Sequence, residues 1–221
     1  MEGARKHQLK VGHKKKRGEK ILVFNVGSSS IKASLFTLNA PDAPTKTAKT
    51  SDMHGEEAIL TQPNFPALML SIHIEAIGTQ NCRLIAKLPK SDAPILEQQS
   101  TVQNYEEGMQ RIFSFLQEKK YLTSYEELLG VGHRIVHGGN RFTASIQLTK
   151  KHLLELEKYA FLAPLHNPHN LAGIKSCGSV FLKANRAIPQ VAVFDTSFHA
   201  TLPALSSRYA IPEEWYKKYG I

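Results

Sequence analysis

The sequence predicts an α/β fold, in which helices pack on the faces of a mixed β-sheet. Strand-like runs dominate the chain up to residue 88, whereas strand-like and helical patterns alternate beyond residue 105. Strands that come first and then alternate with helices are typical of one mixed sheet with helices against it. The 221 residues are 42% hydrophobic and 21% charged, which is an ordinary globular composition and long enough for a sizeable core.

The first strand-like stretch predicts a hairpin with a polar tip. Residues 21–24 form a β-branched and aromatic run, as expected for a strand buried on both faces. Residues 25–30, with the sequence NVGSSS, predict a turn, because Gly27 can take a positive φ and the polar side chains can bond their own backbone. From Ile31 onwards apolar and other side chains alternate, which predicts the second strand.

The remaining elements follow from the same periodicities. Residues 39–66 contain four prolines among threonine, serine and aspartate, which predicts a long loop. Apolar runs predict strands over 68–77, 84–88, 128–136 and 188–194, and helical spacing predicts helices over 105–116, after Thr149 and over 171–182.

The net charge of +9 is concentrated in the first 20 residues, which hold eight basic and two acidic side chains. The other 201 residues hold 20 basic and 17 acidic side chains, so the body of the protein is nearly neutral. Residues 1–19 are therefore predicted to be a disordered basic tail. Basic and aromatic residues are not interleaved in the body, which argues against a nucleic-acid partner.

The sequence also predicts a cytoplasmic protein without a membrane segment. The basic tail lacks the apolar core of a secretory signal, and no run approaches the roughly 18 apolar residues of a membrane helix. Cys82 and Cys177 stand far apart and form no CxxC pair. We expect them to be free thiols in a reducing compartment.

Three polar segments lie at turns beside predicted buried strands, and each is a candidate site with a structural alternative. At the hairpin tip, backbone N–H groups, hydroxyls and Lys32 can hold phosphate oxygens and the shell of an Mg²⁺ ion, although a serine-rich turn alone explains the stretch more simply. Arg134, near a strand end, can bind a carboxylate or phosphoryl group, or pair with a structural acid. Asp195 ends a buried strand, where it can be a catalytic carboxylate or a cap for the next turn.

The histidine spacings raise the question of a zinc site. His133 and His137 are four residues apart, and His166 and His169 are three apart. Pro168 is expected to break helical geometry in the second pair, and the first pair falls in a strand-to-turn segment rather than on one helical face. We therefore favour hydrogen bonding around a ligand pocket over metal ligation by histidine.

Four motifs together resemble the acetate kinase family. They occur in the order seen in that family, and the segments 209–212 (YAIP) and 219–221 (YGI) look similar as well. The resemblance covers about residues 20–221, and its motifs are NVGSSSIK at 25–32, GHRIVHGG at 132–139, APLHNP at 163–168 and FDTSFH at 194–199.

The resemblance implies a ribonuclease-H-like domain of the superfamily of acetate and sugar kinases, heat-shock ATPases and actin. It places this kinase domain at residues 20–198 and the truncated start of a second, nucleotide-binding domain at 199–221. It further implies the N-terminal half of an enzyme that converts ATP and acetate to ADP and acetyl phosphate with Mg²⁺, and that is a homodimer at full length.

By this resemblance, the hairpin residues would serve the nucleotide. Asn25 would help to bind Mg²⁺, and Ser28, Ser30 and Lys32 would lie along the nucleotide phosphates.

The later motifs would serve the acid. Arg134 would bind the carboxylate and the transferring phosphoryl group, and Val136 and Leu165 would form the apolar pocket for the acetate methyl group. Asp195 would be the catalytic acid of the family. Because acetate is already ionised at pH 7, we expect Asp195 to orient the metal, its water shell or the substrate rather than to remove a proton.

The sequence also departs from the family pattern. The second half of the family's chain, with its Phe-His-Gly motif and adenosine pocket, is not in this sequence, so the 221-residue chain alone is expected to be inactive. Asn140 and Arg141 follow the glycine pair where an acidic residue is more usual. Two alternatives remain open: a kinase for propionate or butyrate, and a non-catalytic half-domain that binds anions or a partner.

Overall fold

The computed structural model describes residues 19–38, 47–51, 57–61 and 66–219. The predicted disordered tail, residues 1–19, lies outside the described residues except for Glu19.

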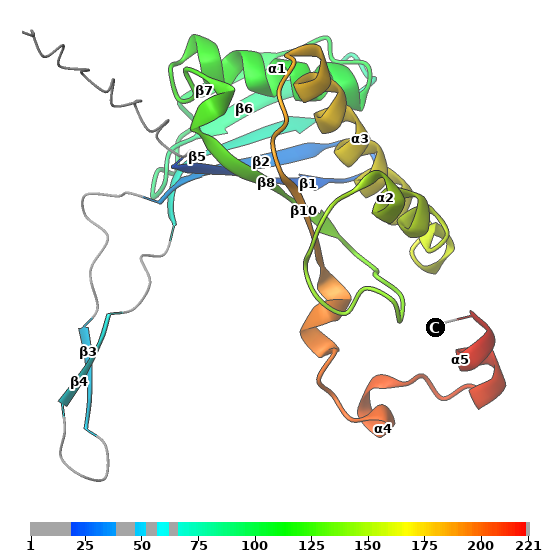
Figure 1. Ribbon diagram of the computed structural model, residues 1–221. Helices are drawn as coiled ribbons and strands as arrows, with labels where there is room; N and C mark the ends of the chain where they lie inside the picture. Colours follow the sequence, from blue (N-terminus) through cyan, green and yellow to red (C-terminus); the bar gives the residue numbers. More distant parts are fainter. Residues whose placement is uncertain (1–18, 39–46, 52–56, 62–65, 220–221) are drawn as a thin grey trace, which may run out of the picture.

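One eight-stranded mixed sheet forms the body of the protein (Figure 1). Its strands are β1 (Lys20–Val26), β2 (Ile31–Thr37), β5 (Ala67–Glu75), β6 (Arg83–Lys87), β7 (Leu96–Gln99), β8 (Leu128–Ile135), β9 (Ile146–Gln147) and β10 (Gln190–Phe194). They lie in the order β7-β6-β5-β2-β1-β8-β10-β9. The three central strands β1, β8 and β10 are parallel to one another, and all other neighbours pair antiparallel.

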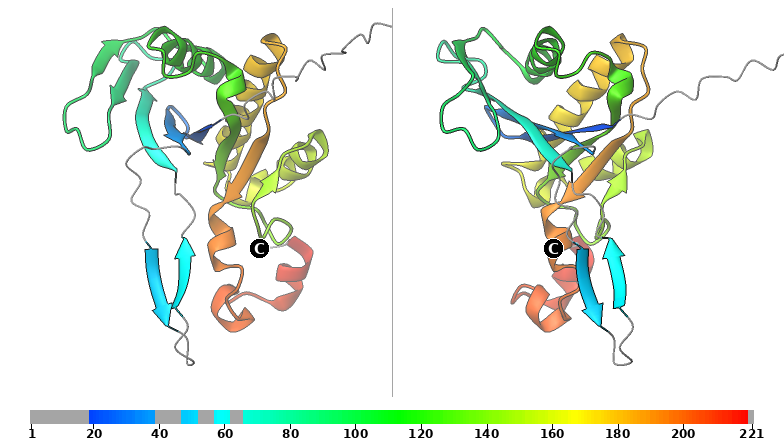
Figure 2. Two further views of the ribbon diagram at one scale, coloured as in Figure 1. Left: turned by 60° about the vertical axis from the view of Figure 1, so that its left-hand side comes forward. Right: turned by 90° about the vertical axis from the view of Figure 1, so that its left-hand side faces the viewer.

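Two long helices lie side by side on one face of this sheet, as Figures 1 and 2 show. They are α1 (Tyr105–Glu118) and α3 (Asn167–Lys183). The α1 helix starts where Asn104 caps it, since the side chain of Asn104 accepts a hydrogen bond from the N–H of Glu107 at 3.0 Å. The other helical segments are α2 (Lys150–Glu157), α4 (Ala204–Ser207), α5 (Glu213–Tyr219), η1 (Tyr125–Glu127), η2 (Ala160–Leu162) and η3 (Asp195–His199).

The core lies between the sheet and these two helices. Burial alternates along β1, so that Leu22, Phe24 and Val26 face the helices. Phe24 contacts Phe113 of α1 with ring centroids 6.2 Å apart, and Phe113 in turn contacts Phe181 of α3 at 5.3 Å. The predicted apolar stripe of the first helix is confirmed, because its members are all buried: Met109, Ile112, Phe113 and Leu116.

The α3 helix approaches β1 closely because Gly173 has no side chain. A Cβ atom at this position would lie 2.5 Å from Cγ2 of Val26. The beginning of α3 is therefore held beside the end of β1, where the hairpin tip follows.

The sequence predicted helices on the faces of the sheet. The structure contains them as α1 and α3, and both lie on the same face. The other face bears half-exposed apolar side chains such as Val193, which is 46% exposed and pairs with Arg134. It also bears Asn25 and Arg134, because these residues alternate with the buried side chains of β1 and β8.

Two segments differ from the sequence prediction. Residues 39–66 were predicted to be a loop, but they contain β3 (Thr47–Ser51) and β4 (Glu57–Thr61), which pair antiparallel as a separate ribbon (Figure 1). The four prolines lie outside both strands, so they do not disturb the pairing. The prediction also missed the short edge strands β7 and β9.

Two further predictions were wrong, one about Pro168 at the start of α3 and one about Asn25 in the hairpin turn. Pro168 does not break the helix, because it lies in the first turn of α3, where a missing N–H costs no intrahelical hydrogen bond. Asn25 belongs to β1 rather than to the turn, which spans residues 27–30. Gly27 is not among the described glycines with positive φ, which are Gly78 and Gly139.

The predicted free thiols are confirmed. Cys82 and Cys177 are both buried and form no disulfide. Burial raises the pKa of the Cys177 thiol far above its ordinary value, so this group remains protonated. None of the described helices is long and apolar enough to span a membrane.

Candidate active site

Three of the predicted site residues meet at the carboxyl ends of the parallel strands. Asn25 is the next-to-last residue of β1, Arg134 is the next-to-last residue of β8, and Asp195 directly follows β10. The ladder register brings them together, since Phe24 pairs with His133 and Arg134 pairs with Val193. The carboxyl edge of parallel strands is where ligands bind in open α/β sheets.

Arg134 is the centre of this cluster. Its Nε donates to both carboxylate oxygens of Asp195 at 3.0 Å, and its Nη2 donates to Oδ2 at 2.7 Å. Its Nη1 donates to Oδ1 of Asn25 at 3.2 Å. The hydrogen bonds that Arg134 donates to Asp195 raise the pKa of the Arg134 guanidinium further above its ordinary value. The sequence analysis offered pairing with an acid as the alternative to ligand binding by Arg134. Arg134 does form such an ion pair, and its partner Asp195 is itself a predicted site residue.

The guanidinium retains donors for a ligand. Three of its five N–H groups point at Asp195 and Asn25, and the remaining two, one on each Nη, have no partner among the described residues. The side chains of Arg134 and Asp195 are 46% and 41% exposed, so an anion can reach this edge from solvent. A planar fork of this kind suits a carboxylate or a phosphoryl group.

Lys32 adds a second positive charge to the same face. It pairs directly with Asn25 across the β1–β2 ladder, and directly paired residues project from the same face of a sheet. Its side chain is exposed. The polar row Lys32, Asn25 and Arg134 therefore runs across three adjacent strands.

The hairpin tip turns its carbonyl groups towards the protein. Tyr105 Oη lies 2.9 Å from the carbonyl oxygen of Gly27 and 2.8 Å from that of Ser28, and the N–H of Ile77 donates to the carbonyl of Ser29 at 3.0 Å. In a trans peptide, the C=O and the following N–H point in opposite directions. The N–H groups of residues 28–30 therefore point outwards.

These N–H groups are available to a ligand. No hydrogen bond within the described part of the chain uses the N–H or the hydroxyl of Ser28, Ser29 or Ser30. Consecutive outward N–H groups form a concavity that binds anions. The predicted site residues Ser28 and Ser30 thus lie in a turn whose outward N–H groups can donate to a negatively charged group.

Two asparagines at the start of α3 hold both loops of the site, and the sequence analysis did not identify them. Asn170 donates through Nδ2 to the carbonyl of Val26 at 2.7 Å and accepts from the N–H of Val136 at 3.2 Å. Asn167 accepts from the N–H of His137 at 3.1 Å and donates to the carbonyl of the same residue at 2.9 Å. Both asparagine side chains are buried, so these bonds fix the ends of β1 and β8 relative to α3.

Val136 and Leu165 are placed differently. Val136 is half-buried beside the Arg134 cluster and is held by Asn170. Leu165 follows η2, and its side chain is 75% exposed. The described residues therefore do not enclose Leu165 in a pocket.

The histidines have separate environments. His133 is 2% exposed, stacks on Phe24 and pairs its Nε2 with the side chain of Gln190 at 2.9 Å. Burial lowers the pKa of His133 to about 4, and the hydrogen bond with Gln190 acts in the opposite direction. Burial also lowers the pKa of His137, whose Nδ1 accepts the N–H of Gly139 at 2.9 Å.

An Mg²⁺ ion held jointly with a nucleotide fits the residues present. Among the described residues, no three histidine, cysteine or carboxylate side chains gather closely enough to form a metal site of their own. Magnesium in nucleotide sites, however, needs just one or two protein oxygens besides phosphates and water. The amide oxygen of Asn25 and the carboxylate of Asp195 both lie within hydrogen-bonding distance of Arg134, and they offer such oxygens.

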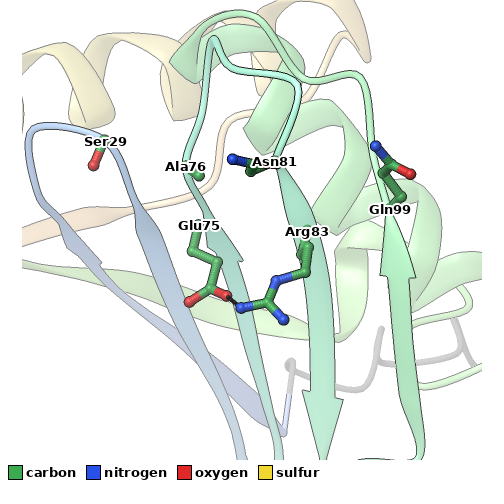
Figure 3. Close-up of a pocket in the computed structure, with 6 residues that line it drawn as sticks. All are labelled: Ser29, Glu75, Ala76, Asn81, Arg83 and Gln99. Carbon is green, nitrogen blue, oxygen red and sulfur yellow. Dashed lines mark hydrogen bonds and ion pairs between the residues drawn. The ribbon is translucent and has the colours of Figure 1, made fainter.

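A second depression lies on the other side of the hairpin tip (Figure 3). It is lined by Ser29, Glu75, Ala76, Asn81, Arg83 and Gln99. The guanidinium of Arg83 bonds the carboxylate of Glu75 and also pairs with Glu97 at 2.8 Å. Because two carboxylates face one arginine, the depression carries no surplus positive charge for an anion.

The chain matches the model of the acetokinase family over residues 20–221. It is 38% identical over 204 residues to the acetate kinase of Halothermothrix orenii and to that of Bacteroides fragilis. Each match covers 91% of this chain and 44% of the relative, so the chain spans less than half the length of these relatives.

Solved structures agree with the sequence relatives. The acetate kinase of Porphyromonas gingivalis superposes with a TM-score of 0.69 at 30% identity, and a propionate kinase of Francisella tularensis with 0.68 at 31% identity. Each covers 92% of this chain and 44% of the solved chain. The predicted fold, a ribonuclease-H-like domain of the acetate and sugar kinase superfamily, is confirmed by these neighbours. The chain belongs to the acetokinase family.

Proposed function

We propose that this chain supplies the acid-binding and phosphate-binding half of a kinase that transfers a phosphoryl group from ATP to acetate. The observation that carries this proposal is the row of Lys32, Asn25 and Arg134, with Asp195, on one edge of the sheet. This row continues into the hairpin tip, whose N–H groups point outwards. Phosphoryl transfer needs mainly positioning and charge neutralisation, which such groups provide.

The hairpin would bind the nucleotide phosphates. Ser28, Ser30 and Lys32 would contact phosphate oxygens, and Asn25, together with Asp195, would hold Mg²⁺. When bound, the ion neutralises developing charge on the phosphoryl oxygens. The backbone of the tip needs no rearrangement for this role, because its carbonyls are already turned away.

Arg134 would bind the carboxylate and the phosphoryl group that passes to it. Its two unpartnered N–H groups can reach one oxygen from each reactant, while Asp195 holds the planar guanidinium in a fixed orientation. Acetate enters as an anion, so Asp195 serves to orient its neighbours rather than to remove a proton. Positive charge at this edge lowers the repulsion between two anionic reactants.

We propose acetate as the acid that binds beside Arg134. Val136 beside Arg134 would line the pocket for the methyl group, and Leu165 would close it. The solved relatives include both acetate and propionate kinases, so propionate or butyrate remains the second candidate. A non-catalytic half-domain that binds anions or a partner is the third candidate.

The location, the oligomeric state and the domain organisation of the enzyme are proposed from its family. We infer a cytoplasmic enzyme that is a homodimer at full length, with residues 199–221 at the start of the nucleotide-binding domain. The exposed side chains of Phe198 and Leu205, which are 85% and 100% accessible, are consistent with a segment that packs against further protein.

An activity assay on a completed enzyme tests the proposal. In this enzyme, residues 20–221 replace the matching part of the Porphyromonas gingivalis acetate kinase. We expect ATP-dependent formation of acetyl phosphate, with a higher kcat/KM for acetate than for propionate, and no measurable turnover by the 221-residue chain alone. A folded completed enzyme without activity towards acetate, propionate or butyrate would favour the non-catalytic half-domain.

A further inference from the structure

The hydroxyl of Tyr105 lies at a junction of three segments that are far apart in the sequence. It is 2.9 Å from the carbonyl of Gly27 and 2.8 Å from that of Ser28, both at the hairpin tip. It is also 2.9 Å from Nδ1 of His169, in the first turn of α3. Tyr105 itself begins α1, so this oxygen links the first turns of both helices to the hairpin tip.

The donors at this junction can be assigned from chemistry. The Tyr105 hydroxyl has one proton, and the two carbonyl oxygens can only accept. If the proton pointed at His169, two carbonyls would face the hydroxyl oxygen at less than 3 Å without a proton between them. The hydroxyl therefore donates to the two carbonyls, and the N–H at Nδ1 of His169 donates to the hydroxyl.

The protonation state of Tyr105 agrees with this assignment. Burial raises the pKa of the Tyr105 hydroxyl above its ordinary value, so the group keeps its proton at neutral pH. The rings of Tyr105 and His169 also meet edge to face, with centroids 6.1 Å apart. This contact fixes the direction from which the imidazole approaches the hydroxyl.

We propose that Tyr105 and His169 are positioning residues that hold the hairpin tip in its anion-binding conformation. They fix the two peptide groups whose N–H groups belong to Ser28 and Ser29, and keep those N–H groups pointing outwards. Neither residue needs to touch the ligand. The proposal rests on the assignment of the tip as a phosphate site, and adds the device that orients it.

Other contacts of the tip make the role of Tyr105 testable. The Val26 carbonyl is held by Asn170 and the Ser29 carbonyl by the N–H of Ile77, so both ends of the turn stay tied without Tyr105. Loss of the hydroxyl should therefore free the middle of the turn and leave the hairpin intact. The structure predicts weaker anion binding without a general loss of fold.

The test uses the 221-residue chain and four variants, titrated with magnesium pyrophosphate while backbone amide resonances are followed. Tyr105→Phe and His169→Leu should weaken binding about three- to tenfold, which is the effect of one lost neutral hydrogen bond. His169→Asn, whose amide can donate from a similar position, should stay within about twofold of the wild type. Tyr125→Phe is the matched control, because Tyr125 packs on Phe113 and Phe181 in the core.

A second readout reports the junction directly. Nitrogen resonances of the imidazole should show His169 with its proton on Nδ1 in the wild type, and a shift towards the Nε2–H form in Tyr105→Phe. A tyrosine that forms no hydrogen bond with His169 would leave this equilibrium unchanged. Thermal melts of all variants establish that they are folded.

The outcomes separate this proposal from the proposed function. Wild-type binding that is unchanged in Tyr105→Phe would overturn the positioning role and leave the phosphate site standing. Absence of pyrophosphate binding in the wild type would overturn the phosphate site and this role with it. In that case the tautomer of His169 would still show whether the hydrogen bond between Tyr105 and His169 exists as a structural contact.

Discussion

The hairpin tip and the Arg134–Asp195 pair are held in opposite ways. At the tip, backbone N–H groups point outwards, and their orientation is fixed from behind by Tyr105 and the N–H of Ile77. At the other end of the candidate site, two half-exposed side chains are fixed mainly by each other. If both regions bind the reactants as proposed, the tip would offer donors in fixed positions, whereas the Arg134 pair could exchange partners with a substrate.

Under the proposed function, this difference would suit what each region binds. The α- and β-phosphates of a nucleotide stay in place while the γ-phosphoryl group is transferred, so a fixed set of N–H groups can hold them at every stage. The phosphoryl group that moves between two oxygens needs donors that can follow it. A guanidinium with unpartnered N–H groups meets that need, and Asp195 limits how far it moves.

The largest expected effect is at Arg134. In the completed enzyme, Arg134→Ala should lower kcat about 100-fold or more, because a main electrostatic donor to the transferring group is lost. Arg134→Lys should recover little of this, since one ammonium cannot reproduce the fork. A raised KM for acetate with nearly unchanged kcat would instead assign Arg134 to ground-state binding of the acid.

Steady-state kinetics with ATP and acetate check this prediction. Arg83→Ala is the matched control, because Arg83 is also half-exposed but pairs with Glu75 and Glu97 beside the second depression. Its kcat should stay within about twofold of the wild type, as for an exposed ion pair. Unchanged kcat and KM in Arg134→Ala would remove this residue from the site.

Asn170 joins the two regions, so its loss should disturb both. Asn170→Ala leaves the carbonyl of Val26 and the N–H of Val136 without partners in a buried setting. We expect a loss of about 2–4 kcal/mol in the free energy of unfolding, measured with denaturant on the 221-residue chain. Asn81→Ala, at the exposed turn between β5 and β6, should change it by less than about 0.5 kcal/mol. Equal effects of the two variants would contradict the role of Asn170.

The buried histidine beneath Arg134 predicts a pH dependence. The folded pKa of His133 is about 4, against an ordinary value of 6.5 in the unfolded chain. Between these values the unfolded state binds a proton that the folded state does not, so stability falls as the pH falls. From pH 7.5 to 5, the loss should be about 2 kcal/mol.

Denaturant unfolding at the two pH values measures this loss. His133→Gln keeps a polar group near Gln190 but cannot titrate, so the variant should lose less stability over the same interval. If proton NMR showed His133 titrating near pH 6.5 in the folded chain, the burial argument would be wrong.

The smallest expected effect concerns the choice of acid. Val136→Ala in the completed enzyme should enlarge the apolar space beside Arg134 and favour propionate over acetate by about 1 kcal/mol, or roughly fivefold in the ratio of kcat/KM. Leu182→Ala, on an 80% exposed side chain of α3, is the control and should leave the ratio unchanged. A ratio unaffected by Val136→Ala would place the methyl pocket elsewhere.

The sequence predicted the parts of the fold that depend on local pattern. The hairpin, the first helix and the strands over 68–77 and 128–136 all appear, with ends displaced by one or two residues. The ribbon of β3 and β4 was missed because its strands lie in a segment with four prolines and many polar residues, a composition that is typical of a loop. The first turn of α3 was missed because we expected Pro168 to break helical geometry, whereas it lies at the beginning of the helix.

The sequence predicted those site residues that are polar and stand at the end of an apolar strand. Asn25, Arg134 and Asp195 stand out in the sequence, and the structure brings their side chains together. Tyr105 was not identified, because its partners at Gly27 and His169 are 78 and 64 residues away, and no local pattern encodes such contacts. The sequence did offer one signal for the residues that hold the site from behind. This signal is the pair of asparagines in the segment 166–170 (HNPHN), at the start of a helix.

The measurement that tests the site most directly is a titration of the wild-type 221-residue chain with MgATP, followed by backbone amide NMR. We predict that the largest shifts fall on Ser28, Ser29 and Ser30, with a further shift of the Arg134 Nε–H as the ligand approaches it. Shifts that are absent from the hairpin tip, or that centre on Arg83 and the second depression, would contradict the assignment of this edge of the sheet as the phosphoryl-transfer site.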